Sequence, residues 1–222
     1  MVSSPLSALS AECARLSSAA SALTDDQWKR PTRCEPWNAA ELLAHITGTV
    51  SRLSWMLEAE PPASATVTAA DYYRPDTRFS PEATADRIDE AVAAAEAGGP
   101  ALAEAFDATW RAAADRCQAE REDRLVTTRY GDAMTLDDFL TTRVVEVAVH
   151  GIDLADAVGL PRWTMPETAR LIVDLLLDQP DALATLGWDP VAFIAKATGR
   201  EAMTDAERDR VTSLGITWLT LS

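Results

Sequence analysis

The chain has 222 residues, of which 47% are hydrophobic and 25% are charged, values typical of a soluble globular protein. Its formal net charge of -15, without a cluster of Lys and Arg, argues against a nucleic acid or an anionic membrane surface as its partner. No stretch approaches the roughly 18 consecutive apolar residues of a membrane helix, and the N-terminus lacks the basic start of a signal peptide. Three cysteines without paired spacing fit a reducing compartment, so we expect a cytoplasmic protein.

The first part of the chain predicts two long helices. A Ser-Pro start followed by apolar residues at alternating spacings of three and four predicts a helix over about residues 5–24. Residues 24–37 contain two prolines and mixed charge, which indicates a loop. Asn38 and Glu41 then form a capping box, and the helix that begins there runs to a Pro-Pro pair. His45 lies on the flank of its apolar face, close enough to point into a bundle.

The middle of the chain is less regular. Residues 61–80 show no sustained period, which indicates a long ordered loop between helices that need each other's apolar faces. Helical segments follow at about 81–97 and 100–121, separated by Gly-Gly-Pro, and they could be one kinked helix or two separate helices. Residues 124–130 suit a short extended piece before a turn.

The stretch Thr135–Ala157 predicts a helix with polar residues in unusual places. Arg143 and His150 fall inside its apolar stripe, and Glu146 lies at the edge of that stripe. The stripe itself consists of Leu136, Phe139, Leu140, Val147 and Leu154. Burying ionisable groups costs several kcal/mol unless they are paired or bind a metal, so these three residues call for a physical explanation.

The remainder predicts a short helical extension. Helices are expected at about 166–178 and 190–198, a further helical turn or two at TDAERDR, and a short edge strand at the tail ITWLTLS. We therefore expect an all-α protein with a helical bundle over residues 1–160 and a short, mainly helical C-terminal extension over 161–222 packed on it.

The two histidines of the chain suggest a metal site. Glu146 and His150 are four residues apart and therefore neighbours on one helix face. If the two helices pack side by side, His45 completes a set of two imidazoles and one carboxylate, which is the pattern of a catalytic metal site with open positions. The alternative is a surface Glu/His pair and a hydrogen-bonded core histidine, and spacing alone leaves both interpretations open.

Two segments resemble a known family. RCEPWNAAELLAHITG (33–48) and TTRVVEVAVHGIDLADAVGLP (141–161) are similar to the signature stretches of the DinB-like superfamily, specifically its mycothiol-dependent maleylpyruvate isomerase-like branch. The resemblance implies an up-down-down-up four-helix bundle in which His45, Glu146 and His150 bind a divalent metal, usually Zn²⁺. It also implies that the metal activates a low-molecular-weight thiol, mycothiol, as the co-substrate that attacks a small electrophile, by isomerisation or by S-transfer.

Three further residues receive roles as hypotheses. Arg143 is proposed to bind a carboxylate of the thiol or of the substrate, the alternative being an ion pair with Glu146 or with an acid from a loop. Asp153, three residues after His150, could hydrogen-bond a ligand imidazole or be a surface acid at the helix end. Cys34 resembles a cysteine often seen before this tryptophan, and we expect it to pack rather than to react.

Three functions remain in competition at this stage. The first is a zinc-dependent thiol transferase or isomerase, whose partners are a small thiol and a small electrophilic substrate, with a homodimer possible. The second is a non-haem Fe(II) enzyme, because two histidines and a carboxylate also suit that ion. The third is a non-catalytic metal-binding helical sensor or interaction module.

Overall fold

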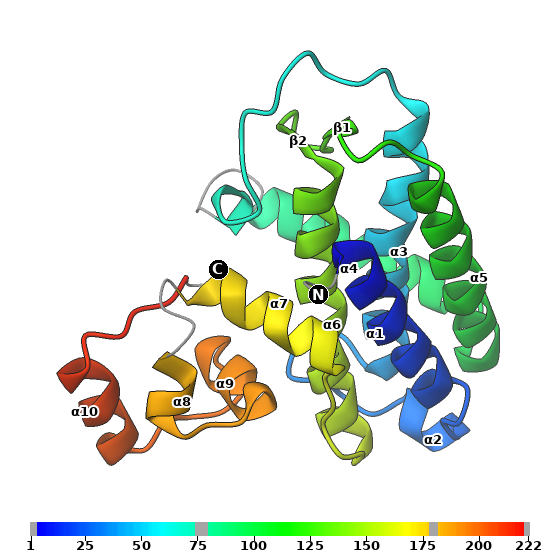
Figure 1. Ribbon diagram of the computed structural model, residues 1–222. Coiled ribbons are helices and arrows are strands. Elements are labelled where there is room, and N and C mark those ends of the chain that lie inside the picture. The colour runs from blue at the N-terminus through cyan, green and yellow to red at the C-terminus, as the bar shows by residue number, and fades with distance from the viewer. Residues whose placement is uncertain (1–3, 74–79, 178–181, 220–222) are drawn as a thin grey trace.

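Helices make up most of the chain. The computed structural model describes residues 4–73, 80–177 and 182–219 (Figure 1). The helices are α1 (Pro5–Ala20), α2 (Asp25–Trp28), α3 (Ala39–Glu58), the short 3-10 helix η1 (Asp71–Tyr73), α4 (Pro81–Ala95), α5 (Gly99–Gln118), α6 (Leu136–Val158), α7 (Pro166–Leu176), α8 (Ala182–Leu186), α9 (Pro190–Ala197) and α10 (Asp205–Ser213). The strands are β1 (Leu125–Thr127) and β2 (Ala133–Thr135). No helix within the described ranges is long and apolar enough to cross a membrane.

Helices α1, α3, α5 and α6 form a four-helix bundle around one apolar core. Arg116 near the end of α5 pairs with Glu58 at the end of α3, with 2.8 Å between Nη1 and Oε1, so these two helices run in the same direction. Gln27 of α2, the short helix that follows the end of α1, donates to the Val158 carbonyl at the end of α6 over 3.1 Å, so α1 and α6 also share a direction. Figure 1 shows α1 running opposite to α3, which confirms the expected up-down-down-up bundle.

A short helix interrupts the segment that was predicted to be a loop. Helix α2 begins with a capping box between Thr24 and Gln27, which explains why α1 ends at Ala20 rather than near residue 24. Trp28 of α2 is buried against the start of α5. A Cβ on Gly99 would lie 2.3 Å from the Trp28 ring, so only glycine allows this contact. The break at Gly-Gly-Pro therefore separates two distinct helices, α4 and α5.

A two-stranded hairpin leads into the long helix α6. Strands β1 and β2 pair antiparallel, with Val126 opposite Met134, so the extended piece expected at 124–130 is one arm of a hairpin. Thr135 then caps α6, its Oγ1 accepting a hydrogen bond from the Asp138 N–H over 3.0 Å. The predicted apolar stripe of α6 is buried.

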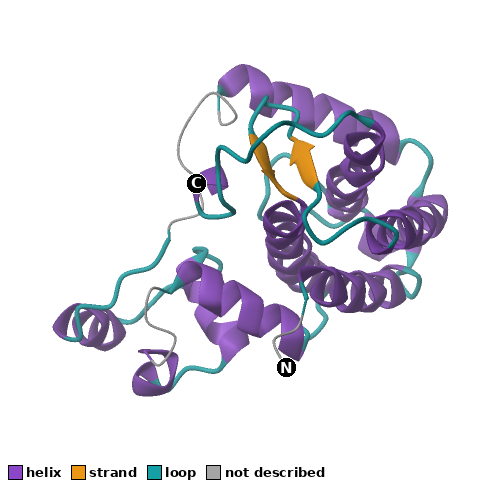
Figure 2. Ribbon diagram, turned by 45° about the horizontal axis from the view of Figure 1, so that its top comes forward, coloured by secondary structure: helices purple, strands orange, loops and turns teal. Residues whose placement is uncertain are grey.

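The C-terminal helices gather to one side of the bundle (Figure 2). Helix α7 packs on α1 and α6, and α9 packs on α7 and α6. The buried Glu12 of α1 accepts a hydrogen bond from the Met165 N–H over 2.9 Å, which joins the two parts of the chain. The predicted edge strand is reduced, in the described part of the tail, to a single bridge between Leu177 and Trp218, and residues 220–222 lie outside the described residues. The domain boundary at residue 160 stays a prediction.

Candidate metal centre

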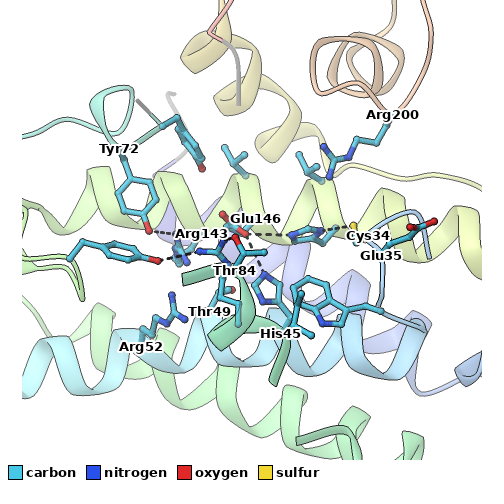
Figure 3. A pocket seen from close by; sticks show the side chains of 18 residues that line it. Cys34, Glu35, His45, Thr49, Arg52, Tyr72, Thr84, Arg143, Glu146 and Arg200 are labelled. Atoms are coloured by element: carbon cyan, nitrogen blue, oxygen red, sulfur yellow. Dashed lines mark hydrogen bonds and ion pairs between the residues drawn. The ribbon is translucent and has the colours of Figure 1, made fainter. Parts of the chain in front are cut away.

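Three potential ligand atoms from two helices converge on one point. Helix α3 carries His45, and α6 carries Glu146 and His150. The Oε2 atom of Glu146 lies 4.0 Å from Nε2 of His45 and 3.6 Å from Nε2 of His150. Their candidate ligand atoms all lie within 4.8 Å of one another, the spacing that a single metal ion requires. Figure 3 shows the side chain of Glu146 in the middle of this group, with His45 reaching it from the neighbouring helix.

The protonation states suit two of these residues for metal binding. Burial and the positive charge of His150 lower the pKa of His45 to about 3, so its ring is neutral at physiological pH. Burial by itself would raise the pKa of Glu146, but the positive charges of Arg143 and His150 outweigh it and lower that pKa. A neutral imidazole and an ionised carboxylate are the forms that bind cations. The Trp37 ring stacks on His45, with 4.4 Å between ring centroids, and limits the positions of the imidazole.

The orientation of His150 is set by Asp153. Its Nδ1 lies 3.0 Å from Oδ2 of Asp153, whose side chain is 0% exposed. Burial would raise the pKa of this carboxyl, yet the hydrogen bonds from His150 and Arg200 outweigh it and hold the pKa well below its usual range. An ionised carboxylate can only accept, so Nδ1 of His150 carries the proton and Nε2 faces Glu146. Burial disfavours charge on His150, but its hydrogen bonds to Asp153 and Cys34 prevail and raise its pKa to about 10.

The three residues form part of the wall of a cavity of about 350 Å³. Arg143 contributes a guanidinium that is 1% exposed, and its Nη2 donates to the Tyr72 hydroxyl over 3.4 Å. Among the described residues, no carboxylate, that of Glu146 included, lies within 4.0 Å of that guanidinium, and the loop residues 74–79 lie outside the described residues. The remaining wall consists of Cys34, Glu35, Trp37, Thr49, Arg52, Tyr73, Thr84, Arg87, Ile88, Tyr130, Val145, Val149 and Arg200 (Figure 3).

The family is shown by a match that spans most of the bundle. Residues 9–155 match the model of the mycothiol maleylpyruvate isomerase N-terminal domain. The chain belongs to this family. The matched range contains both segments that carried the resemblance at the sequence level, together with His45, Glu146 and His150, so the expected family is confirmed.

Two solved structures share the fold. A crystal structure of the mycothiol-dependent maleylpyruvate isomerase aligns with a TM-score of 0.54 at 17% identity, and that of a mutant of this isomerase aligns with a TM-score of 0.55 at 16% identity. Each alignment covers 76% of this chain and 66% of the other. At such identity the likeness concerns the fold. No curated protein matches the sequence.

The structure adds polar contacts that the sequence analysis did not foresee for Cys34. Its side chain is half-buried at the cavity wall, and Sγ lies 3.2 Å from Oδ2 of Asp153 and 3.8 Å from Nδ1 of His150. The candidate ligand atoms of these three residues also lie within 4.8 Å of one another. The two partners are 119 and 116 positions away in the chain, so no local pattern announces the contact.

Three arginines of the cavity wall were also missed, one of which, Arg87, comes from α4. Arg52 lies seven residues after His45, which is two turns along the same face of α3, so helical periodicity could have indicated it. Arg200 lies between α9 and α10 and reaches the cavity from outside the range matched by the family. No motif near it in the sequence points to the site.

Proposed function

We propose that this protein is a zinc-dependent enzyme that uses a low-molecular-weight thiol, mycothiol, to act on a small anionic electrophile. The family supports an enzyme of this kind. The observation that carries the proposal is the convergence of His45, Glu146 and His150 on the wall of a cavity that is also lined by the buried Arg143 and by further arginines. A divalent ion held by these three residues would lower the pKa of a coordinating thiol and provide a thiolate at neutral pH.

The residues around the centre have separate tasks. Asp153 accepts a hydrogen bond from Nδ1 of His150, which turns Nε2 toward Glu146 as the atom that would bind the ion. Trp37 covers one face of the His45 ring and keeps water from it. The ionised Glu146 would compensate part of the charge of the ion.

The end of the cavity where Arg52 and Arg143 lie favours an anionic substrate. In Figure 3, Arg52, Arg143 and Tyr72 lie to one side of Glu146, and Cys34 and Arg200 lie to the other. Burial and the positive charges of Arg129 and Arg143 lower the pKa of Arg52, because the cations repel one another. A carboxylate bound between Arg52 and Arg143 would relieve this repulsion and fix the substrate relative to the ion.

Two outcomes are compatible with this arrangement. A thiolate that adds to an activated double bond and leaves after rotation about the resulting single bond gives isomerisation. A thiolate that stays bonded gives S-transfer. Maleylpyruvate is the first substrate to test, because the two structural neighbours are named for its isomerisation.

Thiol-dependent turnover tests the proposal. Protein loaded with Zn²⁺ is assayed for consumption of maleylpyruvate and of chlorobimane-like electrophiles, with mycothiol, glutathione and bacillithiol compared as thiols. We expect turnover with one thiol in preference to the others and its loss in His45→Ala, while Ser51→Ala, at an exposed position on the same helix, retains it. Absence of turnover with every thiol and electrophile would contradict the proposal.

Metal analysis and melting temperatures of the same protein samples distinguish the competing functions. Iron in protein purified without added metal, together with oxygen-dependent turnover, would favour the Fe(II) enzyme. A lower melting temperature in His150→Ala, without thiol consumption by the unmutated protein, would favour a sensor or interaction module. The homodimer and the cytoplasmic location stay predictions from the sequence.

A further inference from the structure

Arg200 binds the carboxylate that orients His150. Its Nε donates to Oδ1 of Asp153 over 3.0 Å and its Nη2 donates to Oδ2 over 2.9 Å, which is the two-pronged geometry typical of strong Arg-carboxylate pairs. The third nitrogen, Nη1, donates to the Thr198 carbonyl over 2.8 Å. Every nitrogen of the guanidinium is therefore engaged, and its plane is fixed relative to Asp153.

The backbone around Arg200 is itself tied down. The N–H groups of Arg200 and Glu201 both donate to the Ala195 carbonyl at the end of α9, over 2.6 and 2.9 Å. The Glu201 carboxylate lies 2.8 Å from both Arg162 and Lys196. The loop that follows α9 thus forms a rigid base from which the side chain extends toward the end of the cavity where Cys34 lies (Figure 3).

Asp153 depends on Arg200 more than on any other arginine near it. Its side chain is 0% exposed, and a fully buried carboxylate costs several kcal/mol unless it is paired. Arg33 is the other arginine nearby, but its Nε lies 3.9 Å from Oδ1, beyond hydrogen-bond distance, and its side chain is 42% exposed. Without Arg200, the carboxylate would keep only His150 and Cys34 as hydrogen-bond partners and would lose the contacts that fix its plane.

We propose that Arg200 is a positioning residue of the metal centre: through Asp153 it fixes the ring of His150 and the direction of the Nε2 lone pair. The family domain, residues 9–155, supplies the three candidate ligands and Asp153, whereas the C-terminal segment supplies the group that orients them. This inference rests on the proposed function, because it requires that His150 bind a metal. It also assigns the C-terminal segment a part in the centre beyond packing on the bundle.

Zinc affinity tests this role directly. The dissociation constant for Zn²⁺ is measured on the metal-free full chain by competition with a chromophoric chelator, for the unmutated protein, Arg200→Met, Arg200→Lys and the control Arg33→Met. We expect Arg200→Met to raise the dissociation constant about tenfold to a hundredfold, as removal of outer partners of metal ligands does. Arg200→Lys should give an intermediate dissociation constant, because an ammonium keeps the positive charge but cannot form the two parallel hydrogen bonds of the guanidinium. Arg33→Met, which removes a charge near the same carboxylate without removing a hydrogen bond to it, should stay within about threefold.

A second measurement separates positioning from a purely structural role. In the Co²⁺-substituted protein, a reoriented imidazole changes the visible ligand-field spectrum, and we expect that change in Arg200→Met but not in Arg33→Met. Combining Arg200→Met with Asp153→Asn should raise the zinc dissociation constant little beyond the larger of the two single effects, since both act on one contact. If Arg200→Met fails to fold, the zinc dissociation constant and the Co²⁺ spectrum of Arg200→Lys distinguish a positioning role from a purely structural one.

Two results would overturn different statements. An Arg200→Met protein with a lower melting temperature, an unchanged zinc dissociation constant and an unchanged Co²⁺ spectrum would show that Arg200 only fastens the C-terminal segment. Absence of zinc binding by the unmutated chain would instead overturn the proposed function on which the role of Arg200 rests.

Discussion

Zinc binding should release one proton from His150, and Asp153 determines the pH range in which it does so. Without a metal, the pKa of His150 is raised to about 10, whereas that of His45 is lowered to about 3 and that of Glu146 is also lowered. At pH 7, therefore, only His150 must lose a proton before its Nε2 can bind an ion. Three pH units separate pH 7 from this pKa, which corresponds to about 4 kcal/mol of competition between the proton and the metal.

The sign of the effect follows from the raised pKa. As the pH rises toward about 10, less free energy is spent on deprotonating His150, so zinc should bind about tenfold more tightly per pH unit between pH 6 and 9. Asp153→Asn removes the ionised acceptor that stabilises the imidazolium. The pKa of His150 then falls, and the dependence of zinc affinity on pH flattens first at the upper end of this range.

Calorimetry in buffers of different ionisation enthalpy counts the protons, and chelator competition from pH 6 to 9 gives the slope. The comparison of the unmutated protein with Asp153→Asn isolates His150, because protons released elsewhere are common to both. Equal proton release and equal slopes in the two proteins would refute the assignment of the released proton to the His150–Asp153 pair.

Three other substitutions give separate tests. His45→Ala removes one of three ligands and should abolish zinc-dependent stabilisation, which for the unmutated protein is about 2.7 kcal/mol at a zinc concentration one hundred times the dissociation constant; an equal rise in melting temperature with zinc in both proteins would contradict this. Arg143→Leu should lower kcat/KM for an anionic electrophile about tenfold to a hundredfold, mainly through KM, because a charged hydrogen bond contributes about 1.5–3 kcal/mol; an unchanged KM would exclude Arg143 as the anion-binding group. Glu12→Gln addresses stability: burial raises the pKa of Glu12 above its ordinary value of 4.5, so the unmutated protein is favoured at low pH and should lose stability relative to the variant as the pH rises from about 4.5 to neutrality. Urea unfolding at several pH values measures that difference, and a difference independent of pH would show that Glu12 does not titrate in this range.

Local sequence patterns determined the helices and the register of α6. The capping residues Asn38 and Thr135 lie at the observed helix starts, because the hydrogen bonds of a cap span only two or three residues. The same short range explains why Glu146 and His150 were recognised as neighbours one turn apart. The pairing of His45 with them needed the resemblance to the family, since periodicity shows which face of a helix is buried but not which helix covers it.

The short helices show where local patterns fail. Residues 25–28 form α2 inside a segment that two prolines and mixed charge suggested to be a loop. The capping box at Thr24 and the burial of Trp28 against Gly99 stabilise this short helix. Helix α8 (Ala182–Leu186) likewise lies between the helices expected at about 166–178 and 190–198, where no helix was expected. Helices this short depend on contacts with distant helices as well as on their own caps.

The sequence by itself thus determined the helical fold, the family and the three residues that can hold a metal, all of which follow from spacings within a helix or from motifs of contiguous residues. Only the tertiary structure decided what surrounds them. Asp153 accepts hydrogen bonds from Cys34 and Arg200, which lie 119 and 47 positions away, and no pattern in the sequence relates residues at such separations. The packing of the C-terminal helices on the bundle brings Arg200 to the carboxylate of Asp153, and this pairing offsets part of the cost of burying it.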